Sequence, residues 1–259
     1  MEKVIMRIEN VSLRRPLSGP VLENISFDVY KGEFLSIVGM SGTGKTTLLQ
    51  ALAGILPCAS GSIYYKDELI TKPRVEIGLV FQNYALFPWR TALENVEFGL
   101  EIRNVPMQKR RQIAMEALDL LGVGNSKDKY PIELSGGMQQ RVAIAREIVN
   151  KPKILMLDEG FSALDVTVRR QTERYLLDFQ RRFGMTIILV THMVDQALSL
   201  SNRVIVLSDG GIKKIIRLAA GRRPRNIDKP SFRRLLHETE VLLKPTSHMD
   251  VFVKDLKSI

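Results

Sequence analysis

The chain has few of the features on which secreted and membrane-spanning proteins depend. It contains 1 cysteine, Cys58, so no internal disulfide and no cysteine cluster for a metal ion can form. No apolar run approaches the roughly 18 residues of a membrane-spanning helix, and residues 1–7 lack the apolar stretch of a signal peptide. We therefore expect a protein of the cytoplasm.

The charge balance is basic but does not identify a partner. Of the 259 residues, 45% are hydrophobic and 25% are charged, which is an ordinary globular composition. Lys and Arg (38) outnumber Asp and Glu (28), which gives a formal net charge of +10. Such an excess suits nucleic acid, anionic lipid or a polyanionic nucleotide. The charge alone therefore leaves a nucleic-acid function open.

Apolar runs predict the fold class α/β. Alternating runs at 4–8 and 25–30 are typical of antiparallel strands, here near the N-terminus. Short continuous apolar runs, separated by helical segments, then indicate a mostly parallel sheet with helices on both faces. These runs lie at 34–38, 78–81, 154–157, 187–190 and 204–207.

The segment from Thr91 to Val149 has a helical pattern and predicts an inserted subdomain. Pro106 and Pro131 divide it, with helices expected near 92–101, 107–121 and 136–149. We predict a domain over residues 1–220, with this helical subdomain at about 91–149, and a basic C-terminal tail at 221–259. A short helix in the tail carries apolar residues on one face, namely Phe232, Leu235 and Leu236.

A glycine-rich turn follows the apolar run at 34–38 and opens a helix. Its sequence from Gly39 to Thr46 fits the phosphate-binding pattern GxxxxGK[ST]. Glycines let backbone N–H groups surround phosphates, Lys45 can reach the β- and γ-phosphates, and the Thr46 hydroxyl can bind Mg²⁺. The flanking strand and helix argue against an ordinary flexible turn. The predicted nucleotide-binding residues of this loop are Gly39, Met40, Ser41, Gly42, Thr43, Gly44, Lys45, Thr46 and Thr47.

Two carboxylates, Asp158 and Glu159, follow the apolar run at 154–157. Ligands of parallel sheets bind at the carboxyl ends of the strands, so we expect Asp158 to reach the Mg²⁺ beside the phosphates. Glu159 is then the candidate to orient and polarise the attacking water. An exposed acidic pair at a strand end is the alternative, and the phosphate-binding turn argues against it.

A serine and two glycines distinguish this chain from other proteins with a phosphate-binding turn. Residues 134–140 read LSGGMQQ and closely resemble the LSGGQ signature of the ABC ATPase family, and residues 141–146 extend the likeness. At a helix start, a serine hydroxyl and bare N–H groups can bind an anion. The resemblance covers about residues 3–215. It implies a RecA-like P-loop NTPase fold that binds and hydrolyses ATP with Mg²⁺.

The resemblance assigns further residues. Gln82 matches the glutamine that contacts Mg²⁺ or the water, residues 162–165 match the loop that crosses the dimer interface, and His192 matches the histidine that contacts the γ-phosphate. Family members dimerise head to tail, so Ser135, Gly136 and Gly137 would serve the ATP of the partner subunit. The implied catalytic residues are Glu159, His192, Gln82 and Lys45. The implied Mg²⁺ ligands are Thr46, Gln82 and Asp158.

The sequence departs from the family in two places. An aromatic residue that stacks on adenine usually precedes the phosphate-binding loop, but residues 10–23 contain none. Arg14 or Arg15 could stack instead, and a solvated basic loop is the alternative. Gly160 stands where proline usually follows the catalytic glutamate, and we expect it to loosen the turn.

The segment after Gln82 resembles an importer branch of the family. Residues 83–90 and the GRRPR stretch at 221–225 are similar to subunits that serve nitrate, taurine and other sulfonates. The resemblance implies a homodimer at the cytoplasmic face of the membrane, bound to permease subunits and fed by a periplasmic or lipoprotein substrate-binding protein. Residues 84–89 would border the groove for a permease helix, and ordinary packing of the helical subdomain is the alternative.

Two other functions compete with import. An efflux ATPase would share the same motifs. A soluble ABC ATPase acting on DNA or ribosomes would suit the basic charge, but such relatives carry coiled coils, zinc modules or paired ATPase domains that this sequence lacks. We therefore expect ATP-driven import and no nucleic-acid partner.

Overall fold

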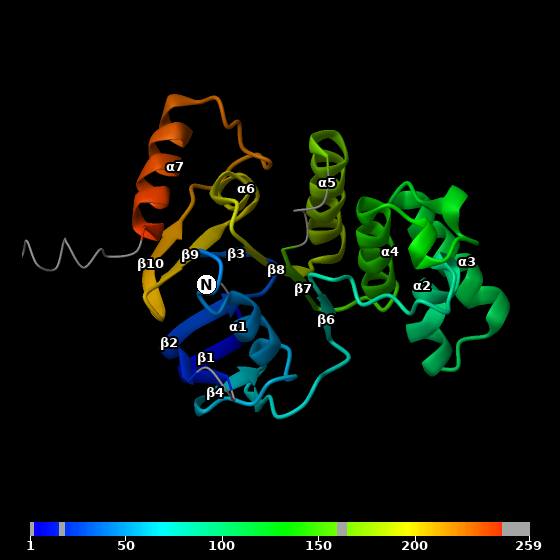
Figure 1. The fold of residues 1–259 in the computed structure, drawn as a ribbon, viewed down its shortest axis with the longest axis horizontal. Coiled ribbons are helices and arrows are strands. Elements are labelled where there is room, and N and C mark those ends of the chain that lie inside the picture. Colours follow the sequence, from blue (N-terminus) through cyan, green and yellow to red (C-terminus); the bar gives the residue numbers. More distant parts are fainter. Residues whose placement is uncertain (1–2, 16–18, 160–164, 245–259) are drawn as a thin grey trace, which may run out of the picture.

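The computed structural model describes residues 3–15, 19–159 and 165–244, and its strands form two sheets (Figure 1). The four-stranded antiparallel sheet has the order β2-β1-β4-β5 and consists of β1 (Val4–Arg15), β2 (Gly19–Tyr30), β4 (Ser60–Tyr65) and β5 (Glu68–Leu69). The six-stranded sheet has the order β10-β9-β3-β8-β7-β6 and consists of β3 (Phe34–Val38), β6 (Ile77–Val80), β7 (Ile154–Asp158), β8 (Thr186–Thr191), β9 (Arg203–Ser208) and β10 (Gly211–Arg217).

The six-stranded sheet is mostly parallel, as the apolar runs predict. Every strand except β10 runs parallel to its neighbours, and β10 pairs antiparallel with β9 at one edge. Strands β3, β7, β8 and β9 are buried along their whole length. Burial on both faces explains why these strands have continuous apolar sequences rather than alternating ones.

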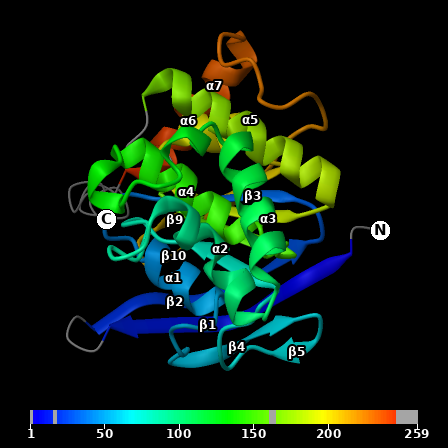
Figure 2. The same cartoon turned by 90° about the vertical axis from the view of Figure 1, so that its right-hand side faces the viewer.

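Helices cover both faces of this sheet (Figure 2). α1 (Lys45–Leu52) lies between the two sheets, whereas α5 (Val166–Phe183), α6 (Val194–Leu200) and α7 (Pro230–Leu243) lie on the opposite face. Leu48 and Leu49 of α1 share one apolar core with Ile8 of β1 and Ile37 of β3. Burying each such side chain stabilises the fold by about 1.5–3 kcal/mol, so the loop before α1 rests on a rigid base.

The predicted helical subdomain consists of α2 (Ala92–Ile102), α3 (Met107–Leu120) and α4 (Gly136–Ile148). α2 begins at a capping box, in which the Thr91 hydroxyl accepts from Glu94 N and the Glu94 carboxylate accepts from Thr91 N. Val96, Leu118 and Ile144 bring the three helices into one apolar core, which continues to β7 and α5. These layers confirm the predicted fold class, including the antiparallel N-terminal region.

The C-terminal segment docks on the sheet domain as far as residue 244. Phe232 is buried, and Leu235 and Leu236 pack with it against β9 and α6. Arg223 donates to the Leu200 carbonyl and to side-chain oxygens of Asn202 and Gln180. The apolar face of the expected helix is confirmed, and the division of the chain at residue 220 stays a prediction.

Three strands were not foreseen from the sequence: β4, β5 and β10. Both residues of β5 are exposed, and most of β10 is partly or fully exposed, so neither has the apolar run that marks a buried strand. In the described part of the chain, no helix combines the length and apolar character needed to cross a bilayer.

Candidate nucleotide-binding and hydrolysis site

The loop between β3 and α1 has a backbone that only glycine accommodates easily. Gly42 and Gly44 have φ of 85° and 91°, in the left-handed region that other residues avoid. A Cβ on Gly44 would also lie 2.5 Å from Val21 Cγ1. The glycines of the phosphate-binding pattern thus serve both the turn and its close approach to β2.

Lys45 is buried, whereas lysine side chains are ordinarily exposed. Its relative exposure is 5%, and its Nζ donates to the carbonyls of Gly39 and Met40 at 2.9 and 2.8 Å. Burial lowers the pKa of Lys45, while the carboxylates of Glu159 and Asp158 act to raise it. The ammonium therefore lies folded back over its own loop, where the phosphates of a nucleotide would compete with the carbonyls.

Thr46 and Asp158 form the oxygen-ligand pair expected for Mg²⁺. The Thr46 hydroxyl donates to Asp158 Oδ1 at 3.0 Å. Burial raises the pKa of Asp158, so a nearby cation would stabilise the charged carboxylate. The described residues contain no cluster of His, Cys, Asp and Glu that could hold a metal ion alone. Mg²⁺ is usually bound through one or two protein oxygens together with substrate phosphates and water, and the Thr46 and Asp158 oxygens can supply the protein part.

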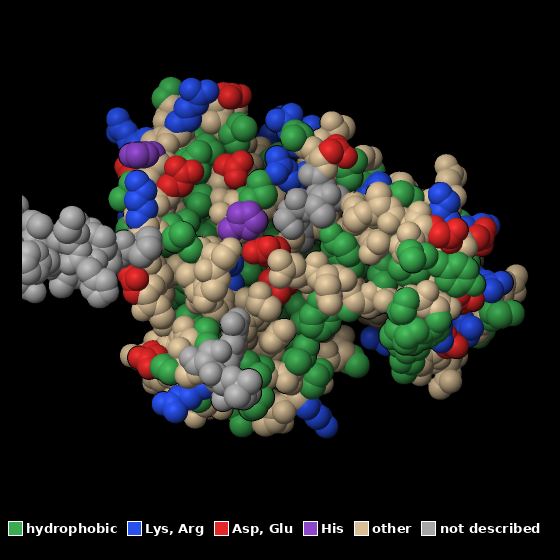
Figure 3. Space-filling model, viewed as in Figure 1, with side chains coloured by type: hydrophobic (Ala, Val, Ile, Leu, Met, Phe, Trp, Pro, Cys, Tyr) green, Lys and Arg blue, Asp and Glu red, His purple; other side chains and the backbone are tan. Residues whose placement is uncertain are grey.

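Glu159 lies between Gln82 and His192. Gln82 Nε2 donates to Glu159 Oε2 at 3.0 Å, and His192 Nδ1 lies 3.4 Å from Glu159 Oε1. The parallel strands β6, β7 and β8 are neighbours, and each of these residues follows one of them, so the three side chains meet at one edge of the sheet. Figure 3 shows a histidine beside acidic side chains at the centre of this face.

The backbone of Glu159 is held in an unusual conformation. Its φ is 48°, which costs free energy for a residue with a side chain, and its N–H donates to the Val190 carbonyl at 2.9 Å. The contact to β8 keeps the carboxylate at the sheet edge. The arrangement can hold a water molecule against a phosphoryl group and accept its proton.

The serine and glycines of the signature lie elsewhere, at the start of α4 in the helical subdomain (Figure 1). Ser135 is the N-cap, and its hydroxyl accepts from Met138 N at 3.3 Å. Ser135 and Gly136 are exposed. No hydrogen bond among the described residues joins Ser135 to the phosphate-binding loop, so within one chain this surface faces outward.

Sequence reasoning missed two buried residues that brace the segment after Gln82. Asn95 accepts from Phe87 N at 2.8 Å and donates to the Phe87 and Arg90 carbonyls. Arg146 donates to the Ala85 carbonyl at 2.6 Å and to the next carbonyl upstream. Both residues belong to stretches that resemble the family, but a sequence does not show which backbone groups a side chain reaches.

Several predicted features cannot be judged from the described residues. Gly160 and residues 162–164 of the interface loop lie outside them, as does the side chain of Arg15. Asp165, the last residue of that loop, caps α5 by accepting from Thr167 N and Val168 N. Arg14 is exposed at the end of β1, so its stacking on adenine stays a prediction.

The sequence matches the family model described as ABC transporter over residues 22–162. An uncharacterized ABC transporter ATP-binding protein of Methanocaldococcus jannaschii is 41% identical over 245 residues, covering 93% of this chain and 91% of that protein. The nitrate import ATP-binding protein NrtD of Synechocystis sp. is 42% identical over 208 residues, covering 78% of each.

A solved dimeric structure of the ATP-binding cassette MJ0796, in a post-hydrolysis state with ADP and Pi, has a similar fold. Its TM-score is 0.78 at 30% identity, and the match covers 84% of this chain and 100% of that one. The matched range 22–162 includes the phosphate-binding loop and the Asp158–Glu159 pair. The chain therefore belongs to the ABC transporter family, as an ATP-binding and ATP-hydrolysing subunit.

Proposed function

We propose that the chain powers solute import as one of two identical ATPase subunits at the cytoplasmic face of a membrane permease. The observation that carries this proposal is the position of Glu159, held between Gln82 and His192 beside the Thr46–Asp158 pair. That geometry suits hydrolysis of a Mg²⁺-bound nucleoside triphosphate. The assignment of the chain to the importers rests on the resemblance of the residues that follow Gln82.

In the proposed reaction, the residues of this chain position and neutralise the phosphoryl group. Lys45 leaves the carbonyls of its loop to bind the β- and γ-phosphates, together with the N–H groups of residues 39–47. Thr46, Asp158 and Gln82 would hold Mg²⁺, which would supply positive charge to neutralise the phosphates. Glu159 accepts a proton from the attacking water, and His192 contacts the γ-phosphate.

The proposed dimer is head to tail. The exposed Ser135 and Gly136 at the start of α4 can receive phosphate oxygens only from outside the chain. A dimeric cassette with the same fold supports this arrangement. Each ATP would lie between one phosphate-binding loop and the Ser135–Gly137 surface of the partner.

The proposed contact with the permease is the segment from Tyr84 to Trp89. Trp89 is 71% exposed, and its ring lies 5.6 Å from that of Phe87. An exposed aromatic residue on a braced loop favours docking of a partner helix. The loop starts beside Gln82, which donates a hydrogen bond to Glu159. A movement of the permease can therefore be transmitted through this loop to the hydrolysis site.

The proposed solute is a small anion such as nitrate, taurine or another sulfonate, delivered by a substrate-binding protein. Relatives of similar identity serve nitrate, glycine betaine or spermidine/putrescine, so this proposal rests on the resemblance of residues 83–90 and 221–225 to the anion importers. The test is uptake by proteoliposomes that contain this subunit with the permease encoded beside it and the binding protein outside. ATP inside should drive accumulation with the wild type and not with Glu159→Gln. ATP-driven release of the solute would contradict import.

A further inference from the structure

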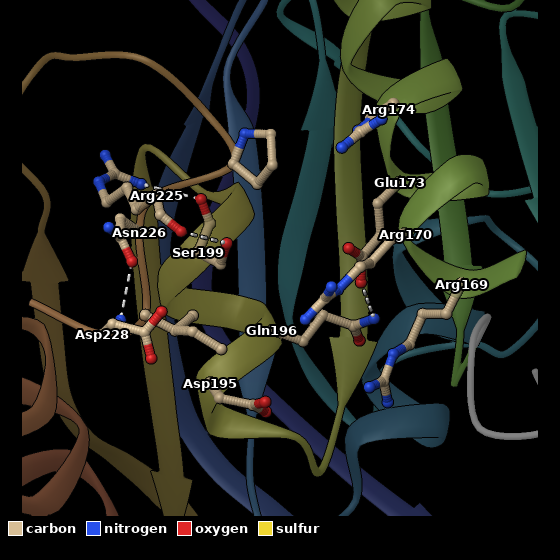
Figure 4. A pocket seen from close by; sticks show the side chains of 12 residues that line it. Arg169, Arg170, Glu173, Arg174, Asp195, Gln196, Ser199, Arg225, Asn226 and Asp228 are labelled. Carbon is tan, nitrogen blue, oxygen red and sulfur yellow. Dashed lines mark hydrogen bonds between the residues drawn. The ribbon is translucent and has the colours of Figure 1, made fainter. Parts of the chain in front are cut away.

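A second pocket lies between α5, α6 and the segment 224–228, away from the phosphate-binding loop (Figure 4). Its volume is about 280 Å³, enough for a small ligand. None of the residues assigned to ATP or Mg²⁺ lines it. Side chains from α5 form one wall, and Ser199 of α6 and Asn226 lie across from them.

Two arginines of α5 extend into this pocket. Arg170 and Arg174 are four residues apart, so both lie on one face of the helix, and Figure 4 shows their guanidinium groups directed toward α6. Neither forms a salt bridge with a carboxylate among the described residues. Lys and Arg side chains gather along this edge of α5 in Figure 3. Like charges at this spacing destabilise a helix, and a bound anion would relieve that repulsion.

The facing wall is the segment 224–228, which hydrogen bonds hold in place. The side-chain Oδ1 of Asn226 accepts from Asp228 N at 2.9 Å. Arg225 adds positive charge while it donates to the carbonyls of Leu198 and Ser201 at 3.1 and 2.7 Å. The loop is thereby fixed opposite the two arginines.

Two of the three acidic residues that line the pocket interact with other side chains. Asp228 pairs with Arg233 at 3.5 Å. Glu173 is buried and accepts from Gln196 at 2.8 Å, and burial raises its pKa although Arg169 and Arg170 act to lower it. Asp195, at the start of α6, forms no salt bridge among the described residues. Among the carboxylates of the pocket, Asp195 therefore has the negative charge that is least balanced by neighbouring cations.

We propose that this pocket binds a small free oxyanion, a phosphate, sulfate, sulfonate or carboxylate, at Arg170 and Arg174 of α5, opposite the segment 224–228. Guanidinium groups bind such oxygens in pairs, through planar forked hydrogen bonds. The site extends beyond the proposed transport function and does not depend on it.

An occupied pocket would act on the hydrolysis site through α6. This helix begins at Val194, directly after His192 and Met193, and Met193 Sδ accepts from Arg169 Nη1 of α5 at 3.6 Å. Gln196 links Glu173 of α5 to α6. An anion that ties α5 to the segment 224–228, which Arg225 joins to α6, would therefore stiffen the surroundings of the turn that carries His192.

The test is calorimetric titration of inorganic sulfate into the full chain, at constant ionic strength and with saturating MgADP to occupy the nucleotide site. Wild type should bind one sulfate, and Arg170→Gln/Arg174→Gln should bind it about tenfold more weakly or worse. The control, Lys109→Gln/Arg182→Gln, removes the same charge from exposed positions outside the pocket and should bind as wild type does. Equal affinity in all three proteins, or no binding to wild type, overturns the proposal.

A second variant distinguishes loss of the anion site from loss of folding. Asp195→Asn removes the least compensated carboxylate and should tighten sulfate binding several-fold, a gain that a misfolded protein cannot show. Unchanged or weaker binding contradicts the charge argument. Vesicles of phosphatidylglycerol separate a free anion from a lipid headgroup. The arginine variant and its control should bind them equally, and a selective loss by the arginine variant would place the anion on a lipid instead.

Discussion

At the scale of a single residue, Lys45 has hydrogen-bond partners within its own loop. In the structure its ammonium is satisfied by the Gly39 and Met40 carbonyls, although the motif assigns it to phosphates. A buried ammonium without such partners would be costly. The two carbonyls therefore hold the ammonium close to where the phosphates are expected to lie.

Lys45→Ala should remove most ATP affinity and essentially all hydrolysis. Because Lys45 is buried and hydrogen-bonded, the variant should also lose about 1–3 kcal/mol of stability. Nucleotide titration and urea unfolding measure the two effects. Lys31→Ala, at an exposed lysine, is the control and should keep both properties. Wild-type turnover in a folded Lys45→Ala protein would contradict the assignment.

Most site residues could be predicted because their motifs specify chemistry and position together. Gly44, Lys45 and Thr46 follow a buried strand, and Asp158 and Glu159 end another, so strand order alone brings them to one sheet edge. The burial of Lys45 could not be predicted, because a lysine in a glycine-rich loop is ordinarily exposed. The contact between Glu159 and Gln82 follows from side-chain geometry, which no spacing in the sequence reveals.

At the scale of elements, the braced loop before α2 connects the hydrolysis site to the proposed permease surface. Asn95 is fully buried on α2 and Arg146 comes from α4, so two helices of the inserted subdomain fix one loop. Tyr84 and Ala85 have φ of 62° and 45°, a strained backbone that persists only with such support.

Asn95→Ala should loosen this loop. The change leaves the Phe87 and Arg90 backbone groups without their side-chain partner, which costs about 1–3 kcal/mol for each buried group left unsatisfied. Hydrogen exchange should quicken in residues 84–90, and the unfolding midpoint should fall. Asn83→Ala, at an exposed asparagine of the same loop, should change neither. Equal exchange in the two variants would rule out the bracing role.

The contact between α5 and α6 predicts a dependence of stability on pH. Burial holds the pKa of Glu173 above the ordinary glutamate value, so the folded protein binds this proton more tightly than the unfolded chain does. Wild-type stability should therefore fall as pH rises from the ordinary pKa through the raised one. Glu173→Gln keeps an oxygen that can accept the hydrogen bond from Gln196. Because glutamine does not ionise, the variant should not lose stability in this way as pH rises.

Urea unfolding of both proteins at about pH 5 and about pH 8 measures how the free energy of unfolding changes as Glu173 ionises. Relative to wild type, Glu173→Gln should be more stable at the higher pH than at the lower one. Glu238→Gln, at an exposed position of α7, is the control and should show little pH-dependent difference. An advantage of Glu173→Gln that shrinks as pH rises would contradict the account.

Elements were predictable from the sequence where burial is complete. Strands such as β7 and β8 are buried on both faces and have unbroken apolar sequences, whereas the largely exposed β10 has no such run. The GRRPR stretch reads as a basic tail because charged runs are usually solvated. Instead, Arg223 and Arg225 donate to carbonyls of α6 and its C-terminal turn, contacts that become visible only once α6 is in place.

At the scale of the whole molecule, the phosphate-binding loop and the signature residues lie on different parts of the chain. The phosphate-binding loop and Glu159 lie on the sheet domain, and Ser135, Gly136 and Gly137 lie on the inserted helices (Figure 1). We propose that two copies complete both sites at once. Dimerisation should then depend on ATP that is bound and not yet hydrolysed.

Glu159→Gln should reveal this dimer. Glutamine keeps the shape of the side chain and loses the base, so turnover should fall roughly 10²–10⁴-fold while ATP binding survives. Adding Gly137→Asp places a carboxylate against the γ-phosphate of the partner's ATP, where like charges partly shielded from water repel strongly. Each subunit of the double variant should still bind ATP through its own loop.

The central claim is tested most directly by light scattering of isolated Glu159→Gln with and without MgATP. The account predicts a monomer without nucleotide, a dimer with MgATP, and a monomer under both conditions once Gly137→Asp is added. A Glu159→Gln protein that stays monomeric while it retains ATP, or a double variant that dimerises with ATP, would contradict the head-to-tail site.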